Sequence, residues 1–359
     1  YGDHRDLHRV DRRQRQMCIR DRYMFSTIFK QEIKYWFQNP AFYIYAVIFL
    51  VLSIFLSAAS TGLFDDVSVT TGSGQIVNSP IAVNNYFNTL SIFIYFLFPS
   101  IIGASIYRDF KSEMHTILYS YPFTKLNYLF AKFFSSITIV SLIVLTIGIG
   151  LVIGFRMPGT NSELLGPFNF ISYLQSYLVF IIPNILFFGA IVFGVVAFTR
   201  NIAAGFITII IVLLVQGLLE SLLSDPDNRF MAAILDPFGA ASVNYYTKYW
   251  TPSEQNELQV PIREMIIFNR LLWLGLATLI FSLVYKFFTF SQNAFSFSLR
   301  KKKSERSTKS NFGGITQINL PTVNYNYSFI QNLKTTWKLS NTDFKYIIKS
   351  SAFISIVLV

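Results

Sequence analysis

Six long apolar blocks constrain the fold of this chain more than any other feature of its sequence. Each block can cross a bilayer as one helix, because a span needs about 20 largely apolar residues. Backbone polar groups in hydrocarbon must be satisfied within their own segment, so we expect each block to be helical. The blocks are Ala41–Ser60, Phe87–Tyr107, Ala131–Phe155, Ser172–Phe198, Ile202–Leu223 and, approximately, Met265–Phe288.

The composition agrees with a membrane protein. Charged residues make up 14% of the 359 residues and hydrophobic residues 52%, whereas soluble domains carry about 25% charged residues. The single cysteine, Cys18, excludes an internal disulfide and a cysteine-based metal cluster. The sequence therefore predicts an all-α polytopic integral membrane protein with six transmembrane helices.

A seventh apolar block begins near Ile347 and is cut at Val359, so we expect the chain to be a fragment of a longer protein. Residues 331–359 then begin a second, truncated transmembrane half. An internal repeat supports this, because "EIKYWFQNPAF" (32–42) and "DFKYIIKSSAF" (343–353) align without gaps before apolar sequence. Chance or a shared interfacial composition is the alternative explanation.

The first 23 residues differ in composition from the rest of the chain. They carry seven Arg and no Lys, and "RRQRQMCIRDR" resembles translated sequencing-adapter sequence. We expect residues 1–23 to be non-native or a disordered arm. A genuine basic arm that binds anionic lipid is the alternative.

Basic residues in the loops predict the orientation of the spans. The stretches Thr61–Tyr86, Arg156–Ile171 and Ser224–Glu264 hold four Lys or Arg between them, and the alternate stretches hold many more. The positive-inside rule then places the N-terminus, residues 108–131 and a basic, polar linker over 299–330 in the cytoplasm. The net charge of +11 is thus explained by orientation, and no nucleic-acid partner is expected.

Two further patterns predict helix contacts and a bend within the spans. Gly150–Gly154 and Ala190–Gly194 are pairs of small residues one turn apart, which allow close helix approach. Pro183 predicts a kink within the fourth block.

The segment "FSTIFKQEIKYWFQ" (25–38) has the period of an amphipathic helix before the first span. This pattern predicts an elbow helix in the membrane interface, which ends at Asn39-Pro40. It either anchors the first span or packs beside a partner subunit. Its characteristic residues are the apolar Phe25, Phe29, Ile33 and Trp36, with Lys34 on the polar face.

The segment "YRDFKSEMHTILYSYPFTKLNYLFAKFF" (107–134) resembles the loop between spans two and three in ABC-2 type membrane subunits of ABC transporters. His115 departs from that pattern, where the family usually has Gly. The resemblance implies an ABC-2 type transmembrane domain over residues 24–298 and an ATPase-coupling helix in this loop. The matching positions are Glu113, Thr116, Ile117, Leu118, Pro122 and Lys132.

The same resemblance implies a function and partners. The chain would be a permease subunit that forms a translocation path in the bacterial cytoplasmic membrane, with a cytoplasmic N-terminus. A separate ATPase subunit would bind ATP, and a second permease half would complete the path, in cis or as a dimer. No "GK" dipeptide or HExxH motif occurs here, so no cofactor and no enzymatic activity are expected on this chain.

Two other functions remain open. The chain resembles the start of long bacterial proteins in which two permease halves are fused to an M1-family aminopeptidase, so it could anchor zinc chemistry located beyond residue 359. The second open function is that of a secondary transporter driven by an ion gradient. It would need buried acids or discontinuous helices at mid-membrane.

Strongly polar residues within spans are functional candidates. Gln216 and Glu220 lie one turn apart in the fifth block, and Asn269 and Arg270 lie near one end of the sixth. We expect an intramembrane pair between Glu220 and Arg270, with either a structural role or a role in the substrate path.

Overall fold

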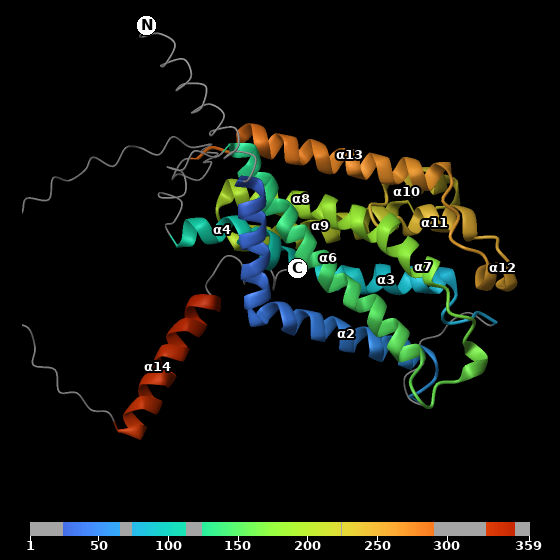
Figure 1. The fold of residues 1–359 in the computed structure, drawn as a ribbon, viewed down its shortest axis with the longest axis horizontal. Helices are drawn as coiled ribbons and strands as arrows, with labels where there is room; N and C mark the ends of the chain where they lie inside the picture. Colours follow the sequence, from blue (N-terminus) through green and yellow to red (C-terminus); the bar gives the residue numbers. More distant parts are fainter. Residues whose placement is uncertain (1–23, 65–73, 113–123, 224, 291–327, 349–359) are drawn as a thin grey trace, which may run out of the picture. The chain divides into compact units, whose positions relative to one another are not determined.

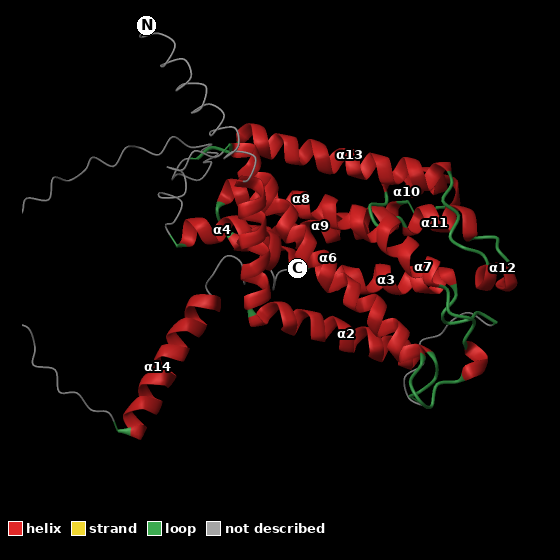
Figure 2. Ribbon diagram, in the orientation of Figure 1, coloured by secondary structure: helices red, strands yellow, loops and turns green. Residues whose placement is uncertain are grey.

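The computed structural model describes residues 24–64, 74–112, 124–223, 225–290 and 328–348. These residues form helices joined by turns and contain no strand (Figure 2). Within the described ranges, five helices are long and apolar enough to span a membrane, or six if one bent pair is counted as a span. The protein is therefore an all-α, multi-pass membrane protein.

The chain divides into two compact units, of which the first ends at Ala294 and the second begins at Phe295. Residues 24–38 form a helix that has no label in Figure 1. The labelled elements of the first unit are α2 (Pro40–Ser60), α3 (Pro80–Tyr95), η1 (Pro99–Gly103), α4 (Ala104–Lys111), α6 (Lys125–Phe155), η2 (Ser162–Leu164), α7 (Phe170–Gln175), η3 (Ser176–Ile181), α8 (Ile182–Thr199), α9 (Ile202–Leu222), η4 (Pro226–Asn228), α10 (Arg229–Leu235), α11 (Ala240–Thr247), α12 (Pro252–Glu257) and α13 (Glu264–Phe287).

The helix over residues 24–38 lies across the direction of the long helices and turns sharply into α2 (Figure 1). Asn39 makes this turn in an extended conformation, and its side chain accepts a hydrogen bond from the Ala41 backbone N–H. Pro40 opens α2, where its missing N–H costs nothing. The helix is present where the sequence predicts it, while its position in the membrane interface stays a prediction.

Small residues bring α2 and α6 into direct contact. A Cβ atom added to Gly150 would lie 2.7 Å from the Leu50 carbonyl oxygen, and one added to Gly154 would lie 2.6 Å from the Ile54 carbonyl oxygen. Gly194 packs α8 against Val284 of α13 in the same way. The predicted contact residues Gly150, Gly154 and Gly194 are thus confirmed.

The second predicted span is bent. α3 begins at Pro80, about two turns before the predicted start, and meets the following helical stretch at an angle of 47°. Pro99 opens that stretch, which begins with the π-helical turn η1. The bend follows from Pro99, which has no N–H to continue the hydrogen-bond pattern of α3.

The fourth span, Phe170–Thr199, is one continuous helical stretch with a π-helical turn directly before Pro183. α7 changes into the π-helical turn η3, and α8 resumes regular geometry with Pro183 in its first turn. At the other end of α8, Arg200 adopts φ 53°, the left-handed conformation that ends many helices. Asn201 then caps α9, so these two residues make the tight turn between the helices.

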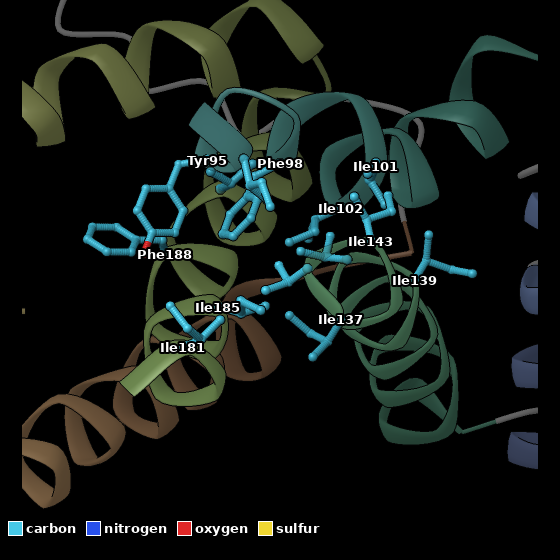
Figure 3. Packing of buried hydrophobic residues seen from close by; sticks show 14 of the residues in the cluster. Tyr95, Phe98, Ile101, Ile102, Ile137, Ile139, Ile143, Ile181, Ile185 and Phe188 are labelled. Carbon is cyan, nitrogen blue, oxygen red and sulfur yellow. The ribbon is translucent and has the colours of Figure 1, made fainter. Parts of the chain in front are cut away.

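The apolar core lies where η1, α6 and α8 meet (Figure 3). Tyr95 and Phe98 extend it with rings 5.2 Å apart, and Phe188 lies 4.7 Å from Tyr95. Phe238, from the turn between α10 and α11, lies 5.7 Å from the same tyrosine ring. This turn is therefore packed into the bundle.

Alternate loops gather at opposite ends of the bundle. At one end the Val77 N–H donates to the Leu164 carbonyl, and the Asn161 N–H donates to the Thr61 carbonyl. At the other end Lys125 Nζ donates to the Lys286 carbonyl at 3.3 Å. The loops with few basic residues and the loops with many thus lie at opposite ends of the bundle, as the distribution of Lys and Arg predicts. Which end faces the cytoplasm stays a prediction.

The second unit contains α14 (Phe329–Ile348), whose described side chains are all exposed. Ile330, Leu333, Trp337 and Phe344 recur at helical spacing and form one apolar stripe. The predicted repeat pairs part of α14 with the helix over residues 24–38. Residues 349–353 of that alignment lie outside the described residues, so the repeat stays a prediction.

Replacing Gly154 with leucine should separate α2 from α6. Overpacking a close helix contact costs about 1–3 kcal/mol, so the free energy of unfolding in detergent should fall by that amount, measured by denaturant titration with tryptophan fluorescence. Gly275→Leu is the matched control, because a Cβ at Gly275 meets nothing within 4 Å. Equal stability of the two variants would contradict the close contact.

Candidate functional site

Four charged side chains meet where the helix over residues 24–38, α4 and α6 come together. Glu32 comes from the first helix, Arg108 and Asp109 from α4, and Lys132 from α6. Glu32 and Lys132 are 5% and 4% exposed. We call these four residues the charge cluster, and its two acids balance its two bases.

The Lys132 ammonium is fully coordinated. Lys132 Nζ donates to Glu32 Oε1 at 2.7 Å and to the Ser105 carbonyl at 2.9 Å, and it lies 2.8 Å from Asp109 Oδ2. An ammonium has three N–H donors, so each has an acceptor. Arg108 Nη2 binds the second carboxylate oxygen of Glu32, Oε2, at 2.5 Å. Each oxygen of Glu32 is therefore paired with one cation.

Two tyrosines complete the cluster. Tyr128 Oη donates to Asp109 Oδ2 at 2.8 Å. The Arg108 guanidinium lies over the Tyr35 ring, 3.7 Å from its centroid, which is a favourable cation–π geometry. Tyr35 belongs to the same helix as Glu32, so Arg108 holds that helix at two points.

The electrostatics of Glu32 follow from its neighbours. Burial alone would raise the pKa of this carboxyl, but the Lys132 ammonium and the Arg108 guanidinium hold the pKa below the ordinary 4.5. Glu32 is therefore an ionised carboxylate at neutral pH. Removing one partner from such a buried pair costs about 3–5 kcal/mol, because the remaining charge stays buried.

The charge cluster involves the two helices that flank the predicted coupling segment in the sequence. α4 ends at Lys111 and α6 begins at Lys125, so Asp109 and Lys132 lie on the two arms that flank this segment. The predicted coupling residue Lys132 is a member of the cluster. The other predicted coupling residues lie outside the described residues: Glu113, Thr116, Ile117, Leu118 and Pro122.

The predicted elbow residues form the helix face beside the cluster. Phe25 and Phe29 stack with ring centroids 5.8 Å apart, and Trp36 is buried. Ile33 packs against the core, and Lys34 is exposed as the polar face requires.

No sequence pattern predicted that Glu32, Arg108 and Asp109 belong to a buried site. A signal for Glu32 was available, because positions 25, 29, 32 and 36 are spaced by three or four residues along one helix face. An acid in an otherwise aromatic stripe indicates a buried partner. The identity of that partner depends on the tertiary packing of α4 and α6.

A second polar site holds the turn of the α10–α11 hairpin, which we call the hairpin lock. Arg270 Nη1 donates to Asn184 Oδ1 at 2.9 Å, and Nη2 donates to the Pro237 carbonyl at 3.1 Å. Asn269 Nδ2 donates to the Ala233 carbonyl at 2.7 Å. α13 and α8 thereby fix this hairpin in the bundle.

The structure does not join Glu220 to Arg270. Arg270 is buried and takes neutral acceptors from Asn184, Asn269 and the hairpin turn. Glu220 is exposed and lines a pocket beside the hairpin. The hairpin supplies backbone carbonyls that the sequence did not reveal, so Arg270 needs no carboxylate contact.

The hairpin lock also requires a glycine. Gly239 has φ 82°, and a Cβ at this position would lie 2.9 Å from Arg270 Cζ. Both the left-handed backbone and the close approach of the guanidinium therefore favour glycine here.

In the part of the chain that the structure describes, no three His, Cys, Asp or Glu side chains form a potential metal site.

Comparison with protein-family models and with curated protein sequences finds no match for this chain.

The pH dependence of stability should report the ionisation of Glu32. Its pKa is lowered by folding, so its contribution is full above about 4.5 and is lost as the pH falls through the folded-state value. Lowering the pH from about 6 to about 3.5 should reduce the free energy of unfolding more in the wild type than in Glu32→Gln, which cannot titrate at this position.

Glu163→Gln serves as the control in the same denaturant titrations, because this exposed acid is far along the chain from the charge cluster. It should keep the wild-type pH dependence. Identical profiles for the wild type and Glu32→Gln would contradict the ion-paired state of Glu32.

Proposed function

We propose that this chain is a membrane-spanning permease subunit of an ABC-2 type transporter. In this proposal residues 113–123 bind a separate ATPase subunit on the cytoplasmic side of a bacterial membrane. A second permease half, in cis or as a dimer, completes the translocation path within the lipid bilayer. The observation that carries the proposal is the position of Lys132, which matches the family pattern and lies at the centre of the charge cluster.

The charge cluster supplies a mechanism for transmitting movement. Displacing α4 or α6 alone would leave a buried charge without its partner, which costs about 3–5 kcal/mol. The two arms and the helix over residues 24–38 are therefore expected to move as one unit. ATP-driven closure of the partner would shift this unit, and with it α2, between two arrangements of the paired halves.

A secondary transporter is the second candidate, and one observation favours it. The bend at Pro99 breaks the second span at an angle of 47°, and interrupted helices line the ion sites of many secondary transporters. This candidate requires transport that follows an ion gradient and needs no ATPase subunit.

Affinity purification of the full chain from native membranes tests the first candidate. The wild type should recover an ATPase subunit and its activity, and Leu118→Asp should lose at least about nine-tenths of both, because a buried charge disrupts an apolar contact. Leu258→Asp is the control, since Leu258 is exposed at the opposite end of the bundle. Undiminished ATPase recovery with Leu118→Asp would refute coupling through this segment, and transport abolished only by an ionophore would support the second candidate.

A further inference from the structure

A pocket of about 360 Å³ lies between the end of α9 and the α10–α11 hairpin. We propose that this pocket binds a zwitterionic group, with its ammonium near Glu220 and Asp236 and its anionic part near Arg229 and Lys248. The pocket uses no residue of the charge cluster or of segment 113–123. The proposal therefore stands or fails independently of ATPase coupling.

The strongly polar side chains of α9, Gln216 and Glu220, lie at this pocket. Leu214, Leu218 and Leu222 are 47%, 64% and 74% exposed, as expected for a helix facing lipid or another apolar surface. Gln216 and Glu220, one turn apart, both line the pocket. Polar side chains in a span are costly unless they face a cavity or a partner, so their placement indicates a hydrophilic site.

Two of the three acids that line the pocket, Asp236 and Glu220, give it a site for an ammonium group. Asp236 is 9% exposed, and its carboxylate accepts the Phe238 and Ala241 backbone N–H groups at 2.8 and 2.7 Å. Gln216 Nε2 also donates to Asp236 at 3.3 Å and ties α9 to the hairpin. Glu220 makes no hydrogen bond or ion pair with another described side chain, so its carboxylate is available to a cationic ligand.

Two bases lie at the open end of the hairpin. Arg229 begins α10 and Lys248 follows α11, so the antiparallel helices bring them to the same end. Arg229 is fixed by the Tyr245 carbonyl and the Tyr249 hydroxyl, both at 3.2 Å. The turn that carries Asp236 is about 10 Å away along α10, as its seven residues imply, so Asp236 and Arg229 lie at opposite ends of this helix. Asp225, the third acid of the lining, precedes Arg229 by four residues and lies on the side of the bases.

The remaining lining is apolar. Leu219, Leu223 and Leu235 face the same space as the charged groups. An ammonium and an anionic group with an apolar extension therefore match the lining. A phosphoethanolamine group has this chemistry, either as the headgroup of a membrane lipid or as a soluble ester.

Lipid binding to the purified full chain tests the proposal. We expect phosphatidylethanolamine, measured by native mass spectrometry in detergent, to bind at least about 10-fold more tightly than phosphatidylglycerol, since a charge-assisted contact is worth about that factor. Glu220→Gln should weaken phosphatidylethanolamine binding about 10-fold, and Lys248→Gln should do the same. Glu257→Gln, an exposed acid of α12 outside the pocket, should change nothing.

The soluble ester glycerophosphoethanolamine distinguishes the two sources. If the ester displaces the lipid, the charged group alone is sufficient for binding. If only the lipid binds, the apolar extension is also required for binding. Both results support the site. Equal affinity for the two lipids would overturn the proposal. Unchanged affinity for phosphatidylethanolamine in both Glu220→Gln and Lys248→Gln would also overturn it. Both positions are exposed, so their replacement leaves the packing of the helices intact.

Discussion

The buried ammonium of Lys132 is the interaction on which one end of this helix bundle depends. An unpaired charge in the interior costs several kcal/mol, and Lys132 is only 4% exposed. It is tolerated because Glu32, Asp109 and the Ser105 carbonyl supply an acceptor for each donor. Three helices must therefore meet at this point. This requirement explains why the helix over residues 24–38 lies across the bundle and why α4 and α6 converge at the charge cluster.

The two ends of the bundle are held by different chemistry. Ion pairs fix the charge cluster, whereas Arg270 at the hairpin lock is held by amide and backbone carbonyl oxygens. Between them, η1, α6 and α8 pack through apolar side chains (Figure 3). Apolar packing is not directional, so the two polar sites fix which helices are neighbours. A coupling movement would then act on the charge cluster, and the proposed ligand would act on the opposite end.

Sequence patterns predicted the features that depend on local composition. The long apolar helices and the Gly150–Gly154 contact follow from hydropathy and side-chain size. The early start of α3 was missed because Asn84, Asn85 and Asn88 lower its hydropathy. The partners of Arg270 and the α10–α11 hairpin depend on contacts between distant segments, which periodicity cannot specify. Lys132 was found through a family resemblance, and the three charges around it only through the structure.

A double-mutant cycle between Glu32 and Lys132 is the most direct measure of whether the charge cluster joins its helices. The free energy of unfolding would be determined for the wild type, Glu32→Gln, Lys132→Gln and the double variant. A buried charge pair should give a coupling energy of about 1–3 kcal/mol, and the same cycle between Glu32 and the distant, exposed Lys248 should be additive within about 0.5 kcal/mol. Additive effects of Glu32→Gln and Lys132→Gln would contradict the role assigned to the cluster.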